Sequence, residues 1–198
     1  MQSDNQLSDK PWYDLPYTRE SFVKRGGIVT VTDRDLDRLI AERQIRLMLL
    51  GPQQRPIWEA SPSPLHQIFV RDIEASIRAL AESGDDCVCE HIADAYIRLP
   101  DNSLVRPDIA IFCAPIPRQR EAYAAVPAAV IEIVSPNYEA KDYEELPPVY
   151  LANGVRDIVV VDPEQGVFTH YRPGHSRSIQ RLPHQLRLAC GCVVQLPA

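Results

Sequence analysis

The chain has 198 residues, of which 45% are hydrophobic and 24% are charged, and its formal net charge is −6. This length suits one domain with a sizeable core, and no apolar run approaches the ~20 residues that span a bilayer. The acidic balance disfavours a surface built to hold nucleic acid non-specifically, although it leaves room for a local basic groove. The polar, acidic N-terminus resembles neither a signal peptide nor a transit peptide, so we expect a cytoplasmic protein.

The N-terminal part, residues 1–58, is expected to form an arm and a helix ahead of a core formed by residues 59–198. The first 27 residues combine prolines with aromatic residues and lack periodicity. Thr32 is a candidate N-cap, and the acidic residues Asp33 and Asp35 follow it in the first turn, where the helix dipole favours negative charge. Apolar residues at helical spacing come next, which predicts a helix here.

The clearest helix signal follows the chain break predicted at "GPQQRP". Ser63 is a candidate N-cap, and Pro64 stands at the first helical position, which needs no backbone donor. Gly84 is expected to end the helix. Apolar residues recur every three or four positions along it: Leu65, Phe69, Ile73, Ile77 and Leu80.

After Gly84 the pattern changes to short apolar runs between turn signals, which predicts strands. The segment 137–153 instead predicts a helix that is bent or interrupted at Pro147–Pro148. This order of elements indicates an α/β or α+β fold, a mixed β-sheet flanked by helices. The predicted strands lie near residues 86–92, 94–99, 108–114, 128–134, 156–162, 166–172, 178–182 and 188–195.

The five cysteines include two C-x-C pairs, Cys87/Cys89 and Cys190/Cys192. In a strand this spacing places both thiols of a pair on one face. An odd number of cysteines without a secretory signal favours reduced, packed thiols. A zinc protein built on the two pairs is a weaker alternative, because zinc sites more often use longer spacings and need four ligands brought together.

Two carboxylates stand out against apolar strand sequence. Asp108 follows Pro107 at the start of one predicted strand, and Glu132 lies inside the next, between Ile131 and Ile133. If these strands are neighbours, the two carboxylates converge and repel by ~3 kcal/mol at ~5 Å and an effective dielectric of ~20. A divalent cation removes this cost, and oxygen-only ligands suit Mg²⁺ or Mn²⁺. The alternative is a turn Asp and a solvent-facing strand Glu without a shared role.

The stretches "VRPDIAIF", "AAVIEIVSPN" and "KDYEELPPVYLANGVRDIVVVDPEQG" together resemble the Uma-type restriction endonuclease family of the PD-(D/E)XK nuclease superfamily. The resemblance covers about residues 60–170. It implies a restriction-endonuclease-like fold and metal-dependent cleavage of DNA. It also implies that Asp108 and Glu132 are catalytic metal ligands, with Mg²⁺ or Mn²⁺ as the cofactor.

The chain departs from the family pattern at its lysine. The superfamily places a Lys two residues after the strand Glu, where this chain has Val134. Members of the family carry it on the following helix, four residues before a Tyr; that Tyr is Tyr150, and the Lys position holds Leu146. Asp142 matches the family, and Lys141 is the nearest substitute, as a base or charge stabiliser. Loss of one such donor commonly costs about 10²–10³ in rate.

Two further positions of the chain bear on the resemblance. The family's N-terminal Glu, in a "Glu-Leu-Ile-x-Gly" hairpin, would fall on Arg38. His66, at the start of the first long helix, also resembles a family position and is expected to be structural or to cap the helix.

The favoured function is a metal-dependent DNA endonuclease that hydrolyses phosphodiester bonds, with Asp108, Glu132 and Lys141 as catalytic residues. A homodimer is expected, because nucleases that cut two strands are commonly dimeric. The alternative is a catalytically degenerate nuclease fold that acts as a nucleic-acid-binding or assembly module. The missing lysine and the acidic balance favour this alternative.

Overall fold

The computed structural model describes residues 22–24, 27–29, 45–80, 87–136 and 138–198. The chain divides into two compact units, Met1–Arg38 and Leu39–Ala198. In the first unit, β1 (Phe22–Lys24) and β2 (Gly27–Val29) form an antiparallel pair. The helix predicted from Thr32 lies outside the described residues.

The second unit begins its described part with a hairpin of β3 (Ile45–Leu50) and β4 (Arg55–Ala60). "GPQQRP" is therefore the turn of a hairpin rather than the break before a helix. Gly51 takes a φ of 70° there, a left-handed conformation that glycine adopts without steric cost. β3 also pairs with β8 (Leu104–Val105), which pairs with β7 (Ile97–Arg98), so these four strands form one sheet.

The central sheet has six strands in the order β13-β12-β11-β10-β9-β6. β10 and β11 are parallel and the other pairs are antiparallel, so the predicted mixed sheet is confirmed. A third, smaller sheet contains β14, β15 and β5. The bounds are β5 Arg78–Ala79, β6 Glu90–Ala93, β9 Ile109–Phe112, β10 Ala129–Ile133, β11 Asp157–Asp162, β12 Val167–Tyr171, β13 Ser178–Arg181, β14 His184–Arg187 and β15 Cys192–Leu196.

Helix α2 (Pro64–Glu74) begins as predicted, because the Ser63 side chain accepts a hydrogen bond from the backbone N–H of His66 at 3.2 Å. Its predicted end is wrong. The helix ends at Glu74, and β5 then pairs with β15. Pairing with a distant strand outweighs the local helical periodicity after residue 74. Leu65 is exposed, and the buried residues of the helix are His66, Phe69, Val70 and Ile73.

The second helical segment combines a π-helical turn, Lys141–Glu145, with α3 (Leu146–Ala152). The helix changes type at Leu146, directly ahead of Pro147 and Pro148, where an interruption was expected. The prolines have no N–H to donate, which leaves carbonyls of the preceding turn free for other partners. One of them, the carbonyl of Tyr143, accepts a hydrogen bond from the Tyr171 hydroxyl at 3.1 Å.

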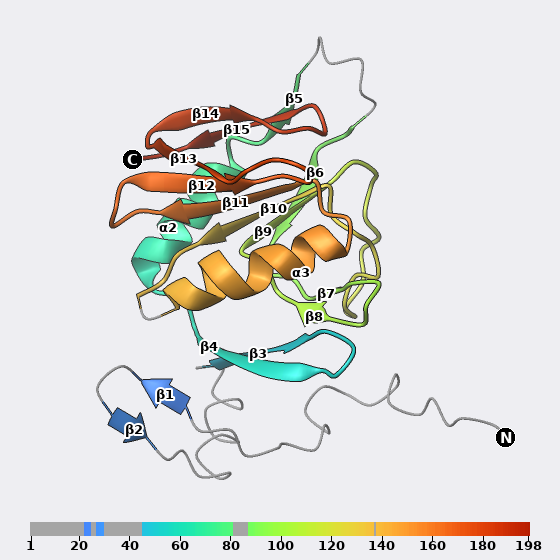
Figure 1. Ribbon diagram of the computed structural model, residues 1–198. Coiled ribbons are helices and arrows are strands. Elements are labelled where there is room, and N and C mark those ends of the chain that lie inside the picture. The colour runs from blue at the N-terminus through green and yellow to red at the C-terminus, as the bar shows by residue number, and fades with distance from the viewer. Residues whose placement is uncertain (1–21, 25–26, 30–44, 81–86, 137) are drawn as a thin grey trace, which may run out of the picture. The chain divides into compact units, whose positions relative to one another are not determined.

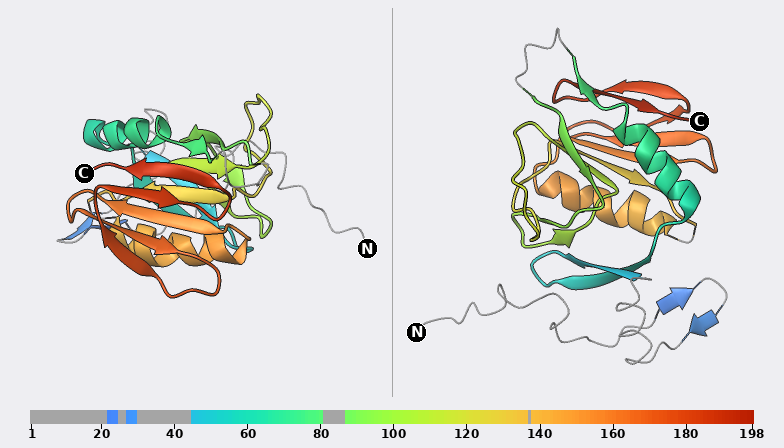
Figure 2. Two further views of the ribbon diagram at one scale, coloured as in Figure 1. Left: turned by 90° about the horizontal axis from the view of Figure 1, so that it is seen from above. Right: turned by 180° about the vertical axis from the view of Figure 1, so that it is seen from behind.

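Helices α2 and α3 cover opposite faces of the central sheet (Figures 1 and 2). The alternation along the strands explains this arrangement. In β10, Ile131 packs in the same core as the α2 residue Ile73, whereas Val130 packs with the α3 residue Tyr150. Among the described residues, no helix combines the length and apolar character needed to cross a membrane.

Four of the five cysteines are paired, as Cys87–Cys113 and Cys89–Cys192. The prediction of reduced thiols throughout is therefore wrong for this structure, and Cys190 is the free, buried cysteine. The sequence separations of 26 and 103 residues explain why local spacing could not predict these pairs.

Candidate active site

Asp108 and Glu132 lie side by side. Asp108 stands directly before β9, and Glu132 lies within β10, the antiparallel neighbour of β9. The backbone N–H of Asp108 donates a hydrogen bond to Glu132 Oε2 at 3.3 Å, and Asp108 Oδ2 accepts one from the N–H of Ile133 at 2.8 Å. Both carboxylates are buried. The pairing of the two strands thus brings both candidate metal ligands to one place.

Helix α2 and strand β3 supply the partners of Asp108. His66 Nε2 lies 2.9 Å from Asp108 Oδ1, and the other ring nitrogen of His66 lies 3.2 Å from the Ser135 hydroxyl. The guanidinium of Arg46 lies 4.0 Å from the same carboxylate oxygen. Burial alone would raise the pKa of Asp108, but the hydrogen bond and charge of His66 and the charge of Lys141 lower it.

Glu132 has the opposite electrostatic character. Its Oε1 accepts a hydrogen bond from the hydroxyl of Tyr150 in α3 at 2.6 Å. Burial and the charge of Asp108 nevertheless raise the pKa of Glu132 well above its ordinary value. One strong cation near this pair would lower the cost of keeping both carboxylates charged.

Lys141, at the start of the π-helical turn, is buried between two carboxylates. Its ammonium donates to Glu59 Oε1 at 2.7 Å and lies 2.8 Å from Asp142 Oδ1. Burial alone would lower the pKa of Lys141, but the charges of Glu59 and Asp142 raise it above its ordinary value. The side chain therefore stays protonated at neutral pH, which suits it to hold charge and not to accept a proton.

Glu59 is the site residue that the sequence did not reveal. It lies in β4 directly opposite Arg46 of β3, and both side chains are buried. The family's N-terminal Glu was aligned with Arg38, which lies outside the described residues. The acidic residue that contacts Lys141 is instead Glu59, in the second strand of the hairpin. The run "RPIWEA" has no alternation of polar and apolar residues, so it does not indicate that the Glu59 side chain is buried.

When all four of its carboxylates are ionised, the cluster holds more buried negative than positive charge. Four carboxylates face the single ammonium of Lys141 and the guanidinium of Arg46, which also lies 2.7 Å from Asp94. The cluster's carboxylates belong to Glu59, Asp108, Glu132 and Asp142. Both oxygens of Asp142 are buried, and neither has a hydrogen-bond partner among the described residues, although Lys141 lies close in an ion pair.

These residues fit a hard divalent cation. Each oxygen of Asp108 and Glu132 accepts one hydrogen bond from the protein and retains a second lone pair for a ligand bond. Carboxylate oxygens are the ligands that Mg²⁺ prefers. A bound divalent cation would also offset the negative excess of the cluster.

The buried acids predict a pH dependence of the metal-free protein. Burial raises the pKa of Asp142 from 3.8 to about 7, so the folded state binds this proton more tightly than the unfolded state. The stabilisation is complete below about pH 4 and is lost as the pH rises to about 7, and Glu132 acts in the same direction. In EDTA, we expect the free energy of unfolding from urea titrations to fall by a few kcal/mol across this window.

The variant Asp142→Asn should lose its share of this dependence, and should gain stability over the wild type at pH 8. The exposed Asp72→Asn is the matched control and should keep the wild-type slope. Equal slopes in wild type and Asp142→Asn would contradict this assignment.

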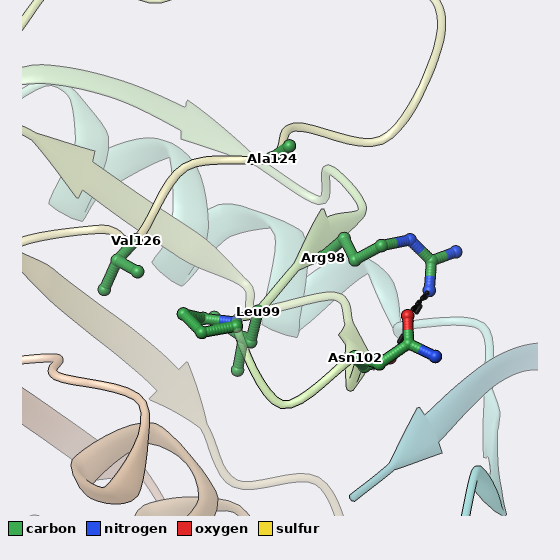
Figure 3. A pocket seen from close by; sticks show the side chains of 6 residues that line it. Arg98, Leu99, Asn102, Ala124 and Val126 are labelled. Atoms are coloured by element: carbon green, nitrogen blue, oxygen red, sulfur yellow. Dashed lines mark hydrogen bonds between the residues drawn. The ribbon is translucent and has the colours of Figure 1, made fainter. Parts of the chain in front are cut away.

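A separate pocket of about 320 Å³ is lined by residues of the β7–β8 turn and of the segment before β10 (Figure 3). None of its lining residues belongs to the acidic cluster. Its single charged side chain, Arg98, donates to Asn102 Oδ1 at 2.9 Å. The chemistry of the candidate site thus lies elsewhere, at Asp108 and Glu132.

Comparison with known proteins supports the fold and identifies the family. The chain resembles the crystal structure of a putative nuclease belonging to DUF820 from Anabaena variabilis, with a TM-score of 0.57 and 17% sequence identity. The alignment covers 73% of this chain and 83% of that one, and it supports the fold. No curated protein matches the chain. The model of the Uma2 family, described as "Putative restriction endonuclease", matches residues 34–191, so the chain belongs to the Uma2 family.

Proposed function

We propose that this protein is a metal-dependent endonuclease that hydrolyses phosphodiester bonds in DNA. The proposal rests on the position of Asp108 beside Glu132, because the backbone N–H of Asp108 donates a hydrogen bond to Glu132 Oε2 at 3.3 Å. Both residues lie in the buried cluster of four carboxylates. Membership of the Uma2 family supports a nuclease-like activity. Mg²⁺ is the proposed cofactor, with Mn²⁺ as a substitute, because the donors are all oxygen.

Asp108 and Glu132 would hold the cation. When bound there, it would supply a Lewis acid for a phosphate oxygen and a lowered pKa for its water. The hydrogen bond from the Ile133 N–H fixes one oxygen of Asp108, and His66 fixes the other. Tyr150 fixes Glu132 in the same way, so both ligands are oriented before the substrate arrives.

Lys141 would stabilise charge in the transition state. The family's usual position holds Leu146, the first residue of α3, which is fully buried in the core between α3 and the sheet and carries no donor. Lys141 instead reaches the cluster from the start of the π-helical turn, and its charge acts on both Asp108 and Glu132. Its raised pKa favours a role in holding positive charge over one as a general base at neutral pH.

Cleavage of supercoiled plasmid tests the proposal. We expect purified protein to convert supercoiled DNA to nicked and linear forms in Mg²⁺ and to leave it intact in EDTA, with activity restored by excess Mg²⁺. Equal cutting with and without EDTA would contradict metal dependence. Size-exclusion chromatography with light scattering tests the homodimer that we retain as part of the proposal.

A second candidate is a binding or assembly module that has lost catalysis. The observation in its favour is the burial of the whole cluster: Asp108, Glu132 and Lys141 each expose no more than 6% of their surface. The ammonium of Lys141 also forms ion pairs with both Glu59 and Asp142. Calorimetry separates the two candidates, since the module predicts no heat of Mg²⁺ or Mn²⁺ binding and no cleavage under any condition.

A further inference from the structure

All five cysteines lie in one region of the fold, although they come from three separate segments of the sequence. Cys87 and Cys89 precede β6, Cys113 follows β9, and Cys190 and Cys192 lie at the β14–β15 turn and the start of β15. A backbone hydrogen bond from Val88 N–H to the Cys113 carbonyl, at 3.2 Å, ties the first two segments together. Three separate parts of the chain thus deliver sulfur atoms to one place.

The sulfur atoms form a single cluster and not two independent pairs. Cys87 Sγ lies 3.5 Å from Cys192 Sγ, although these two cysteines belong to different disulfides. The sulfurs of Cys87, Cys89 and Cys192 all lie within 4.8 Å of one another, and so do those of Cys87, Cys113 and Cys190. Cys87 is therefore the centre of the cluster. Two structural disulfides do not require such convergence, whereas one shared ligand does.

The arrangement of the sulfurs around Cys87 can be compared with a tetrathiolate metal centre, to which Cys113 would be joined through its neighbour Cys87. Zinc binds thiolates at about 2.3 Å, and four sulfurs at the corners of a tetrahedron of that radius lie about 3.8 Å apart. To reach this spacing, reduction must separate the two bonded pairs, and the Cys113 side chain must move towards Cys89 and Cys192, with which it shares no group of close sulfurs in the oxidised protein.

The backbone and surroundings also suit a closed metal site. Cys89 adopts a φ of 52°, an uncommon left-handed conformation for a residue other than glycine, and Gly191 adopts 84° between Cys190 and Cys192. Cys87, Cys89 and Cys192 are buried, as a structural metal site requires. The guanidinium of Arg156 donates to Cys113 Sγ at 3.6 Å, which favours the thiolate and offsets the negative charge of a zinc–thiolate centre.

We propose that the reduced protein binds one Zn²⁺ through Cys87, Cys89, Cys113 and Cys192, with Cys190 as a spare thiol. The zinc form and the disulfide form exclude each other. Reduction of both disulfides takes four electrons from two phosphine molecules, which become phosphine oxides, while two water molecules supply the oxygen atoms and the four thiol protons. Binding of Zn²⁺ then forms four zinc–sulfur bonds and releases the four thiol protons. The site would join the β14–β15 hairpin to β6 and β9 and stabilise the fold.

The test uses the full chain, reduced with a phosphine in the absence of oxygen. We expect one Zn²⁺ per chain by elemental analysis after desalting, and a rise in the thermal midpoint on adding Zn²⁺. Replacement by Co²⁺ should give the visible bands and near-ultraviolet charge-transfer band of a tetrahedral thiolate site. If the reduced, folded wild type binds neither ion, or takes up iron in place of zinc, the proposal is overturned.

Serine variants identify the ligands. Cys87→Ser and Cys192→Ser should lose stoichiometric Zn²⁺, whereas Cys190→Ser, the same substitution in the same cluster, should retain it. Retention of Zn²⁺ by both Cys87→Ser and Cys192→Ser would overturn the site. If Cys190→Ser lost Zn²⁺ while Cys113→Ser retained it, the assignment of Cys113 as the fourth ligand would be overturned. Folding of each variant is checked by circular dichroism, and the outcome is independent of the proposed nuclease activity because no DNA is involved.

Discussion

The variant Glu132→Gln is expected to lower Mg²⁺-dependent plasmid cleavage by at least about 10²-fold, to the background of the assay. The amide retains the shape of the side chain and can still form hydrogen bonds with the Tyr150 hydroxyl and the Asp108 N–H. It removes the negative charge that would bind the cation. The measurement is the initial rate of loss of supercoiled DNA at saturating Mg²⁺.

Stability separates this effect from misfolding. Burial and Asp108 raise the pKa of Glu132, so its charged form costs folding free energy. Glu132→Gln should therefore unfold at the same temperature as the wild type or higher at pH 8, while cleavage is lost. If Glu132→Gln lowered both the unfolding temperature and the cleavage rate, the result would indicate a structural role for Glu132 and would contradict the prediction.

Asp157→Asn provides the matched control. Asp157 is fully buried, and its Oδ1 lies 2.9 Å from His170 Nε2, the same distance that joins Asp108 to His66. It lies at the start of β11 opposite Ala129, whereas Glu132 lies opposite Val160. Asp157→Asn should lower stability but leave the cleavage rate of the folded protein unchanged. Asp108→Asn alone should lose as much activity as the Asp108→Asn/Glu132→Gln double variant, because the two act as one unit.

The meeting of Asp108 and Glu132 could be predicted because charges are rare in buried strands. Ile109–Phe112 is apolar throughout and Ala129–Ile133 is apolar except for Glu132, and the two strands, consecutive in the chain, pair with each other. Once the strands pair, the side chains before β9 and inside β10 must lie near one another. The start of α2 was also predictable, since a Ser cap followed by Pro is a local signal.

Glu59 could not be predicted because its place depends on contacts far away in the sequence. Its strand reaches the site through the pairing of β3 with β8, and its partner Lys141 is 82 residues later. The end of α2 has the same cause. Ile77 continues the helical spacing, but the next residues pair with β15 more than a hundred residues on. Local periodicity carries no information about such partners.

The variant Lys141→Met is expected to lower the free energy of unfolding by about 3–5 kcal/mol at pH 8, because it leaves two buried carboxylates without their cation. Lys141 contacts Glu59 at 2.7 Å and Asp142 at 2.8 Å, and its side chain is 6% exposed. Methionine preserves most of the length and apolar volume, so the loss reports charge more than packing. The measurement is urea-induced unfolding in EDTA, followed by circular dichroism.

Arg55→Met is the matched control. Arg55 contacts Glu145 at 2.6 Å, an equally short ion pair, but its side chain is 54% exposed and that of its partner 37%. Solvent screens such pairs, so this variant should change the free energy of unfolding by only about 0–1 kcal/mol. Equal effects of Lys141→Met and Arg55→Met would show that burial of Lys141 does not govern its contribution.

The double variant Glu59→Gln/Lys141→Met tests the cause directly. If an uncompensated Glu59 charge accounts for the loss, neutralising it should recover part of the stability that Lys141→Met removes. The single variant Glu59→Gln should cost less than Lys141→Met, because Asp142 still pairs with the ammonium. Additive effects of the two substitutions would mean that Glu59 and Lys141 are not coupled. Recovery of stability in the double variant would instead show that Glu59, in the β3–β4 hairpin, is coupled to Lys141 and holds it in the cluster. Lys141 would then be kept at the site by Glu59, while Leu146 occupies the usual lysine position.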